Sequence, residues 1–415
     1  MTPEIKHRIG QIRRGEVPER YVKTALGLAP TDWKRYTFGD IYTERKEPGD
    51  ENLPLLMVSI HSGVSDGEVD AAELPKQVKR IEDKSQYKKA VSGDLVFNMM
   101  RAWQGAIGTV RTTGMVSPAY IVAEPNDKAY PLFMDYYSRT PQMINQLDRQ
   151  SYGVTDFRKR LYWDSFAPIG CILPPIEEQQ KIATILTTQD RVIELKEKRL
   201  AEKQRQKKYL MQQLLTGKKR LPGFNGAWKT DSLDKLFFER KETNCENIEM
   251  LAITGTQGII PRKELDLKDN SSEDKSKYLR VCVGDIGYNT MRMWQGVSAY
   301  SNYEGIVSPA YTILKPSSSI NAKYFAYLFK MSEIVFLFYR FSQGLVDDTR
   351  NLKYENFKKI KVYYPPDIKE QTAIAEVLSA ADREIELLQQ DIEQEKQKKK
   401  ALMQLLLTGI VRVKT

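Results

Sequence analysis

A six-residue motif whose side chains could bind nucleic-acid bases occurs twice in this sequence. It reads Met-Arg-x-Trp-Gln-Gly, at 100–105 and again at 291–296. Arginine can donate two hydrogen bonds to guanine or bind a phosphate, and glutamine can exchange two hydrogen bonds with adenine. The polar side chains with this chemistry are Arg101, Gln104, Arg292 and Gln295. The alternative is that the motif supports the fold, with Trp103 and Trp294 in the core and the closing glycines serving a turn.

Basic side chains also gather in both halves of the chain, shortly before a pair of prolines. They are Arg158, Lys159 and Arg160 in the first half, and Arg350 and Lys353 in the second. Cations on a loop suit phosphate oxygens, which position a protein on a nucleic acid, better than they suit base edges. If the chain binds nucleic acid, we expect these five residues to contact phosphates.

The residue inventory gives no support for catalysis. Only His7 and His61 are available as imidazoles, too few for a His-rich metal site or for two His-based active sites. No glycine-rich phosphate-binding motif is present. Residues 364–367 resemble the Asn/Asp-Pro-Pro-Tyr/Phe loop of DNA methyltransferases but lack its leading amide or carboxylate. We predict no catalytic residue and no metal site, and expect the acidic residues beside the proline pairs to stabilise helix starts.

The overall composition fits a globular chain that favours a polyanionic partner. Among 415 residues, 64 lysines and arginines outnumber 54 acidic residues and give a formal charge of +10. A hydrophobic content of 41% supports real cores, and three widely spaced cysteines fit reduced thiols in a cytoplasmic protein. No run approaches the ~18 apolar residues of a membrane span, so no membrane association is expected.

The chain repeats itself at a distance of about 191–195 residues. Besides the six-residue motif, Ser-Pro-Ala-Tyr at 117–120 recurs unchanged at 308–311, and the proline pair at 174–175 recurs at 365–366. Because these matches keep their order over most of the chain, composition cannot explain them. The sequence therefore predicts a tandem duplication.

The first part of each copy predicts a compact α+β domain of about 140 residues. Short apolar runs read as strands at 55–60, 94–97 and 120–122. The stretches 130–147 and 322–339 read as helices.

The second part of each copy predicts one long helix. Neither 176–216 nor 368–408 contains proline or glycine, and each is followed by a glycine that can end a helix. Apolar residues recur at heptad spacing in both stretches, and near the middle of each stretch the same heptad positions hold polar residues. Helices of about 40 residues would each be roughly 60 Å long. We expect them to pack together as an antiparallel spacer; the alternative is independent surface helices or coiled-coil dimerisation arms.

The N-terminal segment resembles the tail of the repeated unit. Ile5, Ile9 and Ile12 have helical spacing, and Gly15 with Pro18 corresponds to a glycine and proline after the first long helix. We expect this N-terminal helix to dock beside the C-terminal helix.

Together, the domain order and the entry into each long helix resemble the specificity subunit of type I restriction–modification enzymes. The residues that carry this resemblance are Leu-Pro-Pro-Ile-Glu-Glu-Gln-Gln-Lys-Ile-Ala at 173–183 and Pro-Pro-Asp-Ile-Lys-Glu-Gln-Thr-Ala-Ile-Ala at 365–375. Leu-Leu-Thr-Gly at 214–217 and 406–409, and Pro-Thr-Asp-Trp at 30–33, match as well. The second helix entry has one extra residue after its prolines, which affects only the cap geometry.

The resemblance implies an α+β pseudo-twofold repeat with two target-recognition domains separated by two long antiparallel helices. The expected segments are an N-terminal helical extension (1–30), recognition domain 1 (31–172), a central spacer helix (173–218), recognition domain 2 (219–363) and a C-terminal spacer helix (364–415). Each recognition domain would read one half of a split site in double-stranded DNA, using Arg101, Gln104, Arg158, Lys159, Arg160, Arg292, Gln295, Arg350 and Lys353.

The resemblance also implies partners. The helices would set the gap and dock two methyltransferase subunits, and a motor–nuclease subunit would complete the complex. The chain itself would not be an enzyme, and S-adenosylmethionine would be bound by the methyltransferase. Two alternatives stay open: a stand-alone DNA-binding regulator and a coiled-coil interaction scaffold without an enzymatic partner.

Overall fold

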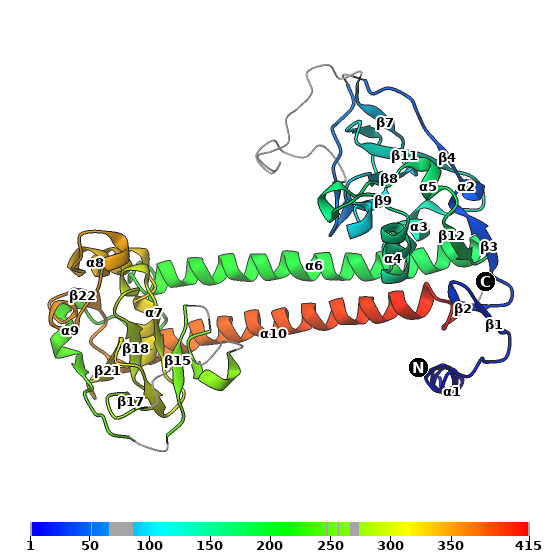
Figure 1. The fold of residues 1–415 in the computed structure, drawn as a ribbon. Helices are drawn as coiled ribbons and strands as arrows, with labels where there is room; N and C mark the ends of the chain where they lie inside the picture. Colours follow the sequence, from blue (N-terminus) through cyan, green and yellow to red (C-terminus); the bar gives the residue numbers. More distant parts are fainter. Residues whose placement is uncertain are drawn as a thin grey trace. The chain divides into compact units, whose positions relative to one another are not determined.

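The computed structural model describes residues 2–50, 52–65, 86–245, 248–255, 257–265 and 274–413. The chain divides into two compact units: Met1–Leu195 with Ile392–Thr415 forms the first unit, and Lys196–Asp391 forms the second unit. The two long helices, α6 (Ile176–Leu214) and α10 (Ile368–Leu406), are shared between the units (Figure 1). Each unit therefore holds the opening half of one long helix and the closing half of the other.

The first unit is an α+β domain built on a four-stranded antiparallel sheet in the order β4–β11–β8–β9, with two-stranded sheets β1–β2, β3–β12, β5–β6 and β7–β10. Its strands are β1 (Tyr21–Thr24), β2 (Gly27–Pro30), β3 (Lys34–Thr37), β4 (Tyr42–Glu44), β5 (Val58–Ser59), β6 (Gly63–Val64), β7 (Lys88–Ala90), β8 (Leu95–Asn98), β9 (Ile107–Thr109), β10 (Gly114–Val116), β11 (Tyr120–Pro125) and β12 (Gly170–Leu173). Its shorter helices are α1 (Pro3–Arg13), α2 (Phe38–Ile41), α3 (Pro131–Tyr137), α4 (Pro141–Arg149) and α5 (Trp163–Phe166).

The second unit repeats this topology, with the sheet order β14–β21–β18–β19 and the pairs β13–β22, β15–β16 and β17–β20. Its strands are β13 (Lys229–Ser232), β14 (Phe237–Glu239), β15 (Leu251–Ile253), β16 (Ile259–Pro261), β17 (Leu279–Val281), β18 (Ile286–Asn289), β19 (Ser298–Tyr300), β20 (Gly305–Val307), β21 (Tyr311–Pro316) and β22 (Lys361–Tyr364). Its shorter helices are α7 (Ala322–Leu328), α8 (Ser332–Phe341) and α9 (Tyr354–Phe357).

Strand register shows that the two units are copies. Tyr120 pairs with Asn98 in the first sheet, and Tyr311 pairs with Asn289 in the second, 191 residues later in each strand. The predicted tandem duplication of an α+β domain is therefore confirmed.

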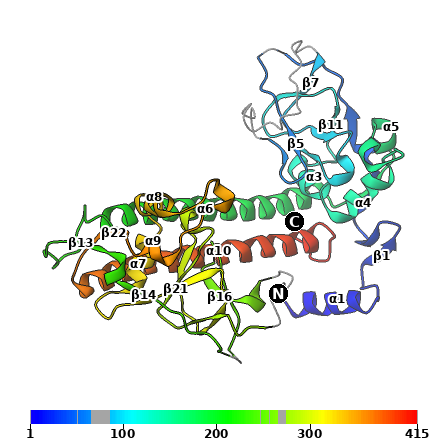
Figure 2. The ribbon, with the colours of Figure 1, turned by 60° about the vertical axis from the view of Figure 1, so that its left-hand side comes forward.

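In each unit a short helix lies between the main sheet and a long helix. In the first unit α3 occupies this position, between α6 and the sheet that contains β11 and its neighbour β8 (Figure 2). Phe97 on β8, Phe133 on α3 and Leu186 on α6 are fully buried in one hydrophobic cluster. The second unit buries equivalent residues of β18, α7 and α10 in the same way. Burial of each such side chain stabilises the fold by about 1.5–3 kcal/mol, so the long helices are part of the domain cores.

The helices predicted at 130–147 and 322–339 are each two helices in the structure. In the first unit the break falls before Pro141, which lacks a backbone N–H and disfavours helix in the preceding residue. Thr140 caps the new helix by accepting a hydrogen bond from the Met143 amide. The second unit breaks at the same place without proline, where Phe329 and Met331 are buried in the core.

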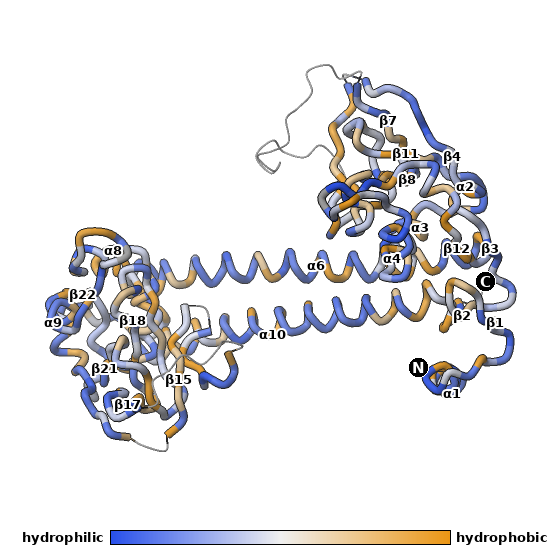
Figure 3. Tube along the Cα trace, in the orientation of Figure 1, coloured by the Kyte–Doolittle hydropathy of each residue, from blue (hydrophilic) through white to orange (hydrophobic). Residues whose placement is uncertain are grey.

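The long helices begin at the predicted residues and end near the predicted glycines, Gly217 and Gly409, which both have φ of +71°. In the second unit Lys196 pairs with Asp391 and Lys203 with Glu384, so residue numbers rise along α6 as they fall along α10. The helix pair is therefore antiparallel, as predicted. Figure 3 shows hydrophilic residues dominating both helices, with hydrophobic residues recurring at intervals.

The N-terminal helix α1 contacts the segment that follows α10. The Arg8 guanidinium donates to the carbonyl of Ile410 (2.9 Å), and the Tyr21 hydroxyl donates to that of Gly409 (2.6 Å). The N-terminal segment and the turn beyond α10 thus meet in the first unit. No helix in the described part of the chain is long and apolar enough to cross a membrane.

Candidate nucleic-acid interface

The duplicated Met-Arg-x-Trp-Gln-Gly motif forms the same tight turn in both units. A single turn of 3-10 helix, Ala102–Gln104, joins β8 to β9, and Met293–Gln295 joins β18 to β19. Gly105 and Gly296 close the turns with φ of +98° and +80°, a left-handed conformation that favours glycine. The turn role of both glycines is confirmed.

The two tryptophans of the motif are not core residues, so this part of the alternative interpretation is wrong. Trp103 and Trp294 are half-buried, whereas Ala102 and Met293 are fully buried. A single 3-10 turn directs the residue before tryptophan into the core and leaves the indole along the surface. Each indole N–H donates to the carbonyl of the motif's methionine, at 3.0 Å in the first unit and 2.9 Å in the second, so the tryptophans brace the turn.

The polar pair of each turn is available for a ligand. Arg101 and Gln104 are exposed in the first unit, as are Arg292 and Gln295 in the second. Within the described residues, none of these four side chains forms a hydrogen bond or an ion pair. An exposed guanidinium and carboxamide without protein partners can exchange their hydrogen bonds to water for bonds to a base or a phosphate.

A hairpin-like loop is attached to each turn. Tyr152 and Arg160 exchange backbone hydrogen bonds of 2.9 and 2.8 Å, and Gln343 and Asn351 exchange two of 2.7 Å. The next residue of each loop donates its amide to the segment that enters the turn, from Leu161 to Met99 and from Leu352 to Thr290, each at 2.9 Å. We call the turn 100–105 with loop 151–162, and the turn 291–296 with loop 342–353, the turn–loop surfaces.

The predicted cations lie on these surfaces, but two of them are held by neighbouring side chains. Lys159 pairs with Asp148 (2.7 Å) and Asp156 (3.1 Å), its ammonium lies 4.8 Å from the Trp103 ring centre, and the hydrogen bond to Asp148 raises its pKa. In the second unit Arg350 pairs with Asp347 (3.2 Å) and stacks 4.1 Å from the Tyr339 ring centre. Both cations therefore brace their loops, a role that sequence spacing did not indicate.

The other three predicted cations differ in environment. Arg158 and Lys353 are exposed and have no hydrogen bond or ion pair with any side chain that the structure describes. Arg160 is half-buried, and its guanidinium donates to the carbonyl of Lys159 at 2.8 Å. By position Lys159 corresponds to Arg350, and Lys353 corresponds to Tyr162, so the two surfaces carry different charges.

Each α+β domain is fastened to its long helix by a glutamine from the helix entry motif. Gln179 is buried; its side-chain oxygen accepts from the Tyr130 amide (2.8 Å), and its nitrogen donates to the Lys128 and Pro174 carbonyls (both 2.9 Å). Gln371 makes the same kind of contacts with backbone of the second unit. The carboxamide satisfies backbone groups that would otherwise be buried without partners.

The glutamate before each of these glutamines lies in the first turn of its long helix, where it was predicted, and also makes buried side-chain contacts. Glu178 is fully buried and accepts hydrogen bonds from Arg412 (2.7 and 2.8 Å) and from the Trp33 indole (3.3 Å). Glu370, only 2% exposed, pairs with Arg220 (2.7 Å) and Trp228 (3.4 Å). In both units an arginine beyond the end of one long helix thus clamps the start of the other.

A tyrosine and a lysine complete the attachment of each domain to both helices. The Tyr136 hydroxyl donates to Asp190 (2.6 Å), and Lys399 pairs with the same carboxylate. Tyr327 donates to Asp382 (2.6 Å), which pairs with Lys207. Burial and the bonded carboxylate raise the pKa of both tyrosines. These clamps hold each α+β domain against the long helices. In the described residues, no group of three or more side chains of the metal-ligating types is found.

Comparisons with known proteins agree with this architecture. The MjaVIII type I restriction enzyme specificity subunit of Methanocaldococcus jannaschii is 24% identical over 95% of this chain and 97% of its own. The fold is similar to a type I restriction–modification S subunit from M. genitalium (TM-score 0.55, 11% identity, 90% of this chain and 96% of the other). It is also similar to a chain solved in work on complex assembly in the type I restriction–modification system (TM-score 0.52, 16% identity, 92% and 99% covered).

The family model for the type I restriction modification DNA specificity domain matches residues 76–205 and 235–397, which is most of the chain and covers both copies. The chain therefore belongs to the family of type I restriction–modification DNA specificity subunits, which are non-catalytic.

Proposed function

We propose that each unit reads one half of a two-part DNA site through its turn–loop surface. The observation that carries this proposal is the repeated turn, which in both units presents an exposed arginine and glutamine. On this proposal residues 31–172 and 219–363 are the two target-recognition domains. Arg158 and Lys353, exposed on the attached loops, supply phosphate contacts, whereas Lys159 and Arg350 act mainly by holding the loops.

The long helices set the spacing between the half-sites. At 39 residues each they are about 58 Å long, given a rise of ~1.5 Å per residue. Half-sites read by a twofold arrangement lie about 34–36 Å apart, one turn of DNA, and helices of this length can span that distance.

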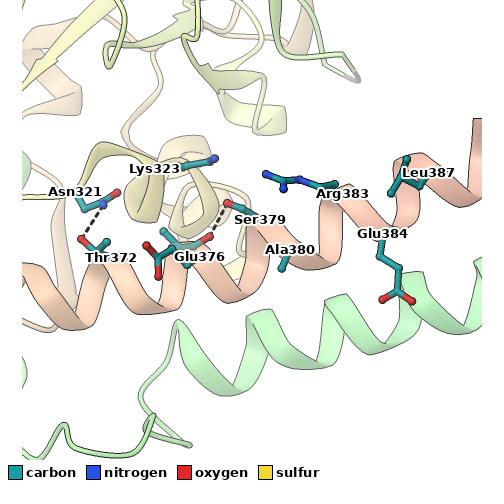
Figure 4. Close-up of a pocket in the computed structure, with 10 residues that line it drawn as sticks. Asn321, Lys323, Thr372, Glu376, Ser379, Ala380, Arg383, Glu384 and Leu387 are labelled. Carbon is teal, nitrogen blue, oxygen red and sulfur yellow. Dashed lines mark hydrogen bonds between the residues drawn. The ribbon is translucent and has the colours of Figure 1, made fainter.

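Two methyltransferase subunits bind the long helices, one at each copy of the repeated unit, and S-adenosylmethionine is bound by these partners. Leu195 on α6 and Leu387 on α10 stand at equivalent positions and are 49% and 59% exposed. In the second unit Leu387 borders an open groove of about 670 Å³, toward which the side chains of Lys323 and Arg383 extend (Figure 4). An apolar centre with a polar rim is the arrangement of a protein interface, and on this proposal Leu195 and Leu387 belong to such centres. A motor–nuclease subunit completes the restriction complex.

The test is a binding selection with the chain co-purified with its methyltransferase. A random DNA pool should yield two short half-sites separated by a fixed gap. Arg101→Ala should relax one half-site and Arg292→Ala the other, each costing about 1–3 kcal/mol of discrimination. Lys235→Ala, which removes a solvent-exposed cation that pairs with Asp231 and lies outside the turn–loop surfaces, is the matched control. The proposal fails if both arginine variants affect the same half-site, or if the chain selects its site equally well without a methyltransferase.

A further inference from the structure

Each turn–loop surface ends in an aliphatic side chain that projects fully into solvent. Val154 is 93% exposed and Leu345 is 101% exposed, and they occupy equivalent positions in the two units. A single exposed hydrophobic residue is ordinary. The same placement in both copies, at the tip of the loop that is bonded to the candidate base-reading turn, indicates a shared role.

The backbone of each loop determines where its tip lies. Reciprocal backbone hydrogen bonds close each loop. Gly153 and Gly344 directly precede the tips, at the point where the two sides of the loop approach each other most closely. A Cβ on Gly153 would lie 2.5 Å from the backbone of Arg158, and one on Gly344 would lie 2.7 Å from that of Arg350. Gly344 also has φ of +142°. The close approach therefore requires glycine, and the residue after it is presented outward.

The turn–loop surfaces that carry these tips also hold exposed apolar and cationic groups. The turn methionines Met100 and Met291 are 41% and 44% exposed, and Val346 next to Leu345 is 58% exposed. The exposed arginine of each turn lies in the same turn–loop surface. An aliphatic tip has no donor or acceptor for a phosphate, so it can add binding energy only through apolar contact.

We infer that Val154 and Leu345 are specificity-determining residues that pack against thymine methyl groups in the major groove. The thymine 5-methyl is the apolar group that base pairs present in that groove. This inference rests on the proposed function, because it needs each turn–loop surface to face DNA. The first tip is followed by Thr155 and the second by Val346, so the two half-sites meet different apolar surfaces.

The experiment measures equilibrium binding of the methyltransferase-bound chain to its selected site. Leu345→Ser and Val154→Ser should each weaken binding roughly fourfold or more, since burial of one methyl-sized group contributes about that factor. The two variants should affect opposite half-sites. Because both side chains are exposed, neither change should alter folding. Val283→Ser, which changes a 63% exposed valine outside the turn–loop surfaces, is the control and should bind like the parent chain.

A change in the DNA separates methyl contact from other roles. Replacing the thymines of one half-site by deoxyuridine should weaken the parent complex by a similar factor, and the serine variant of the corresponding tip should show no further loss. Additive losses would overturn the inference in favour of an apolar wedge between base pairs. Loss of the methyltransferase from the variant complex would overturn it in favour of a protein contact.

The remaining outcomes separate this inference from the proposed function. Half-sites without thymine, or tip variants that bind like the parent, would overturn the inference alone. A parent complex that selects no two-part site would overturn the proposed function itself.

Discussion

Breaking the buried arginine–glutamate pair of the first unit should destabilise that unit strongly. Arg412 donates to both oxygens of Glu178 and to both oxygens of Asp32, all at 2.7–2.8 Å. Arg412→Met keeps the apolar stem but leaves the fully buried Glu178 with two neutral donors among the described residues, the Trp33 indole and the Val413 amide, both at 3.3 Å. Removal of one partner from a buried ion pair costs about 3–5 kcal/mol.

The lower end of that range applies here, because Arg412 is 32% exposed and water can approach the vacated position. A unit of roughly 220 residues loses about 2–4 °C of melting temperature per kcal/mol, so a fall of about 6–12 °C is expected. Because the chain has two units, the hydrogen exchange of backbone amides should be measured for each unit separately. In the variant, the amides of the first unit should exchange faster, and those of the second unit should exchange at the parent rate.

The double variant Arg412→Met with Glu178→Gln tests the cause. The neutral amide can still accept from Trp33 but carries no buried charge, so the double variant should regain about 2 kcal/mol of the loss. The reasoning would be refuted if the effects of the two substitutions were additive, since additivity means that no coupling exists between the residues. Arg220→Met, with Glu370 as its partner, should produce the same pattern in the second unit.

Four further outcomes are expected. If the complex neutralises 6–10 phosphates, its DNA affinity should fall roughly 10³–10⁵-fold between 50 and 200 mM salt, and a flat salt dependence would contradict phosphate contacts. Deleting residues 197–203 together with 384–390 removes seven residues that face each other on the two long helices, which shortens both helices by about 10 Å. In a binding selection the gap between the half-sites should then shorten by about three base pairs, and the half-sites themselves should stay unchanged. Hydrogen bonds from Lys229, Lys235 and Tyr364 lower the pKa of Asp231 to about 2. The ionised Asp231 should therefore stabilise the second unit fully above pH 4, and this stabilisation should be lost as the pH falls toward 2. Urea unfolding of Asp231→Asn should not show this pH dependence of stability. Gln104→Ala and Gln295→Ala should relax corresponding bases of opposite half-sites in inverted orientation, and binding selections that stay unchanged for both variants would show that the glutamines do not read bases.

The sequence predicted the long helices and the duplication well, because buried residues recur at regular spacings in both. The long helices carry heptad spacing and lack proline and glycine, so their starts at Ile176 and Ile368 could be predicted to the residue. The duplication could be predicted because the same buried and turn positions recur at one distance. The helix break before Pro141 is a local effect of proline and could have been predicted. It was missed because helical spacing of apolar residues continues on both sides of the proline.

The candidate site was predicted less completely, because its geometry depends on residues far apart in the chain. The motif at 30–33 was identified by resemblance, yet only the fold shows that Asp32 and Trp33 meet Arg412 and Glu178. Similarly, Lys159 looks like a free cation in the sequence, and only the position of Asp148 on α4 shows that it is paired. Propensity and spacing describe one segment at a time and cannot supply such contacts.

The two units differ in a way that separates support from recognition. The main contacts of the buried clamp are repeated: glutamate with tryptophan and arginine, glutamine with backbone, and tyrosine with aspartate and lysine. On the turn–loop surfaces, by contrast, Asp148 corresponds to Tyr339, and Val154 to Leu345. Exposed substitutions of this kind cost little stability. A scaffold that fixes the position of each surface through buried contacts therefore leaves the surface residues free to differ, which is what a protein needs to read two different half-sites with one repeated fold.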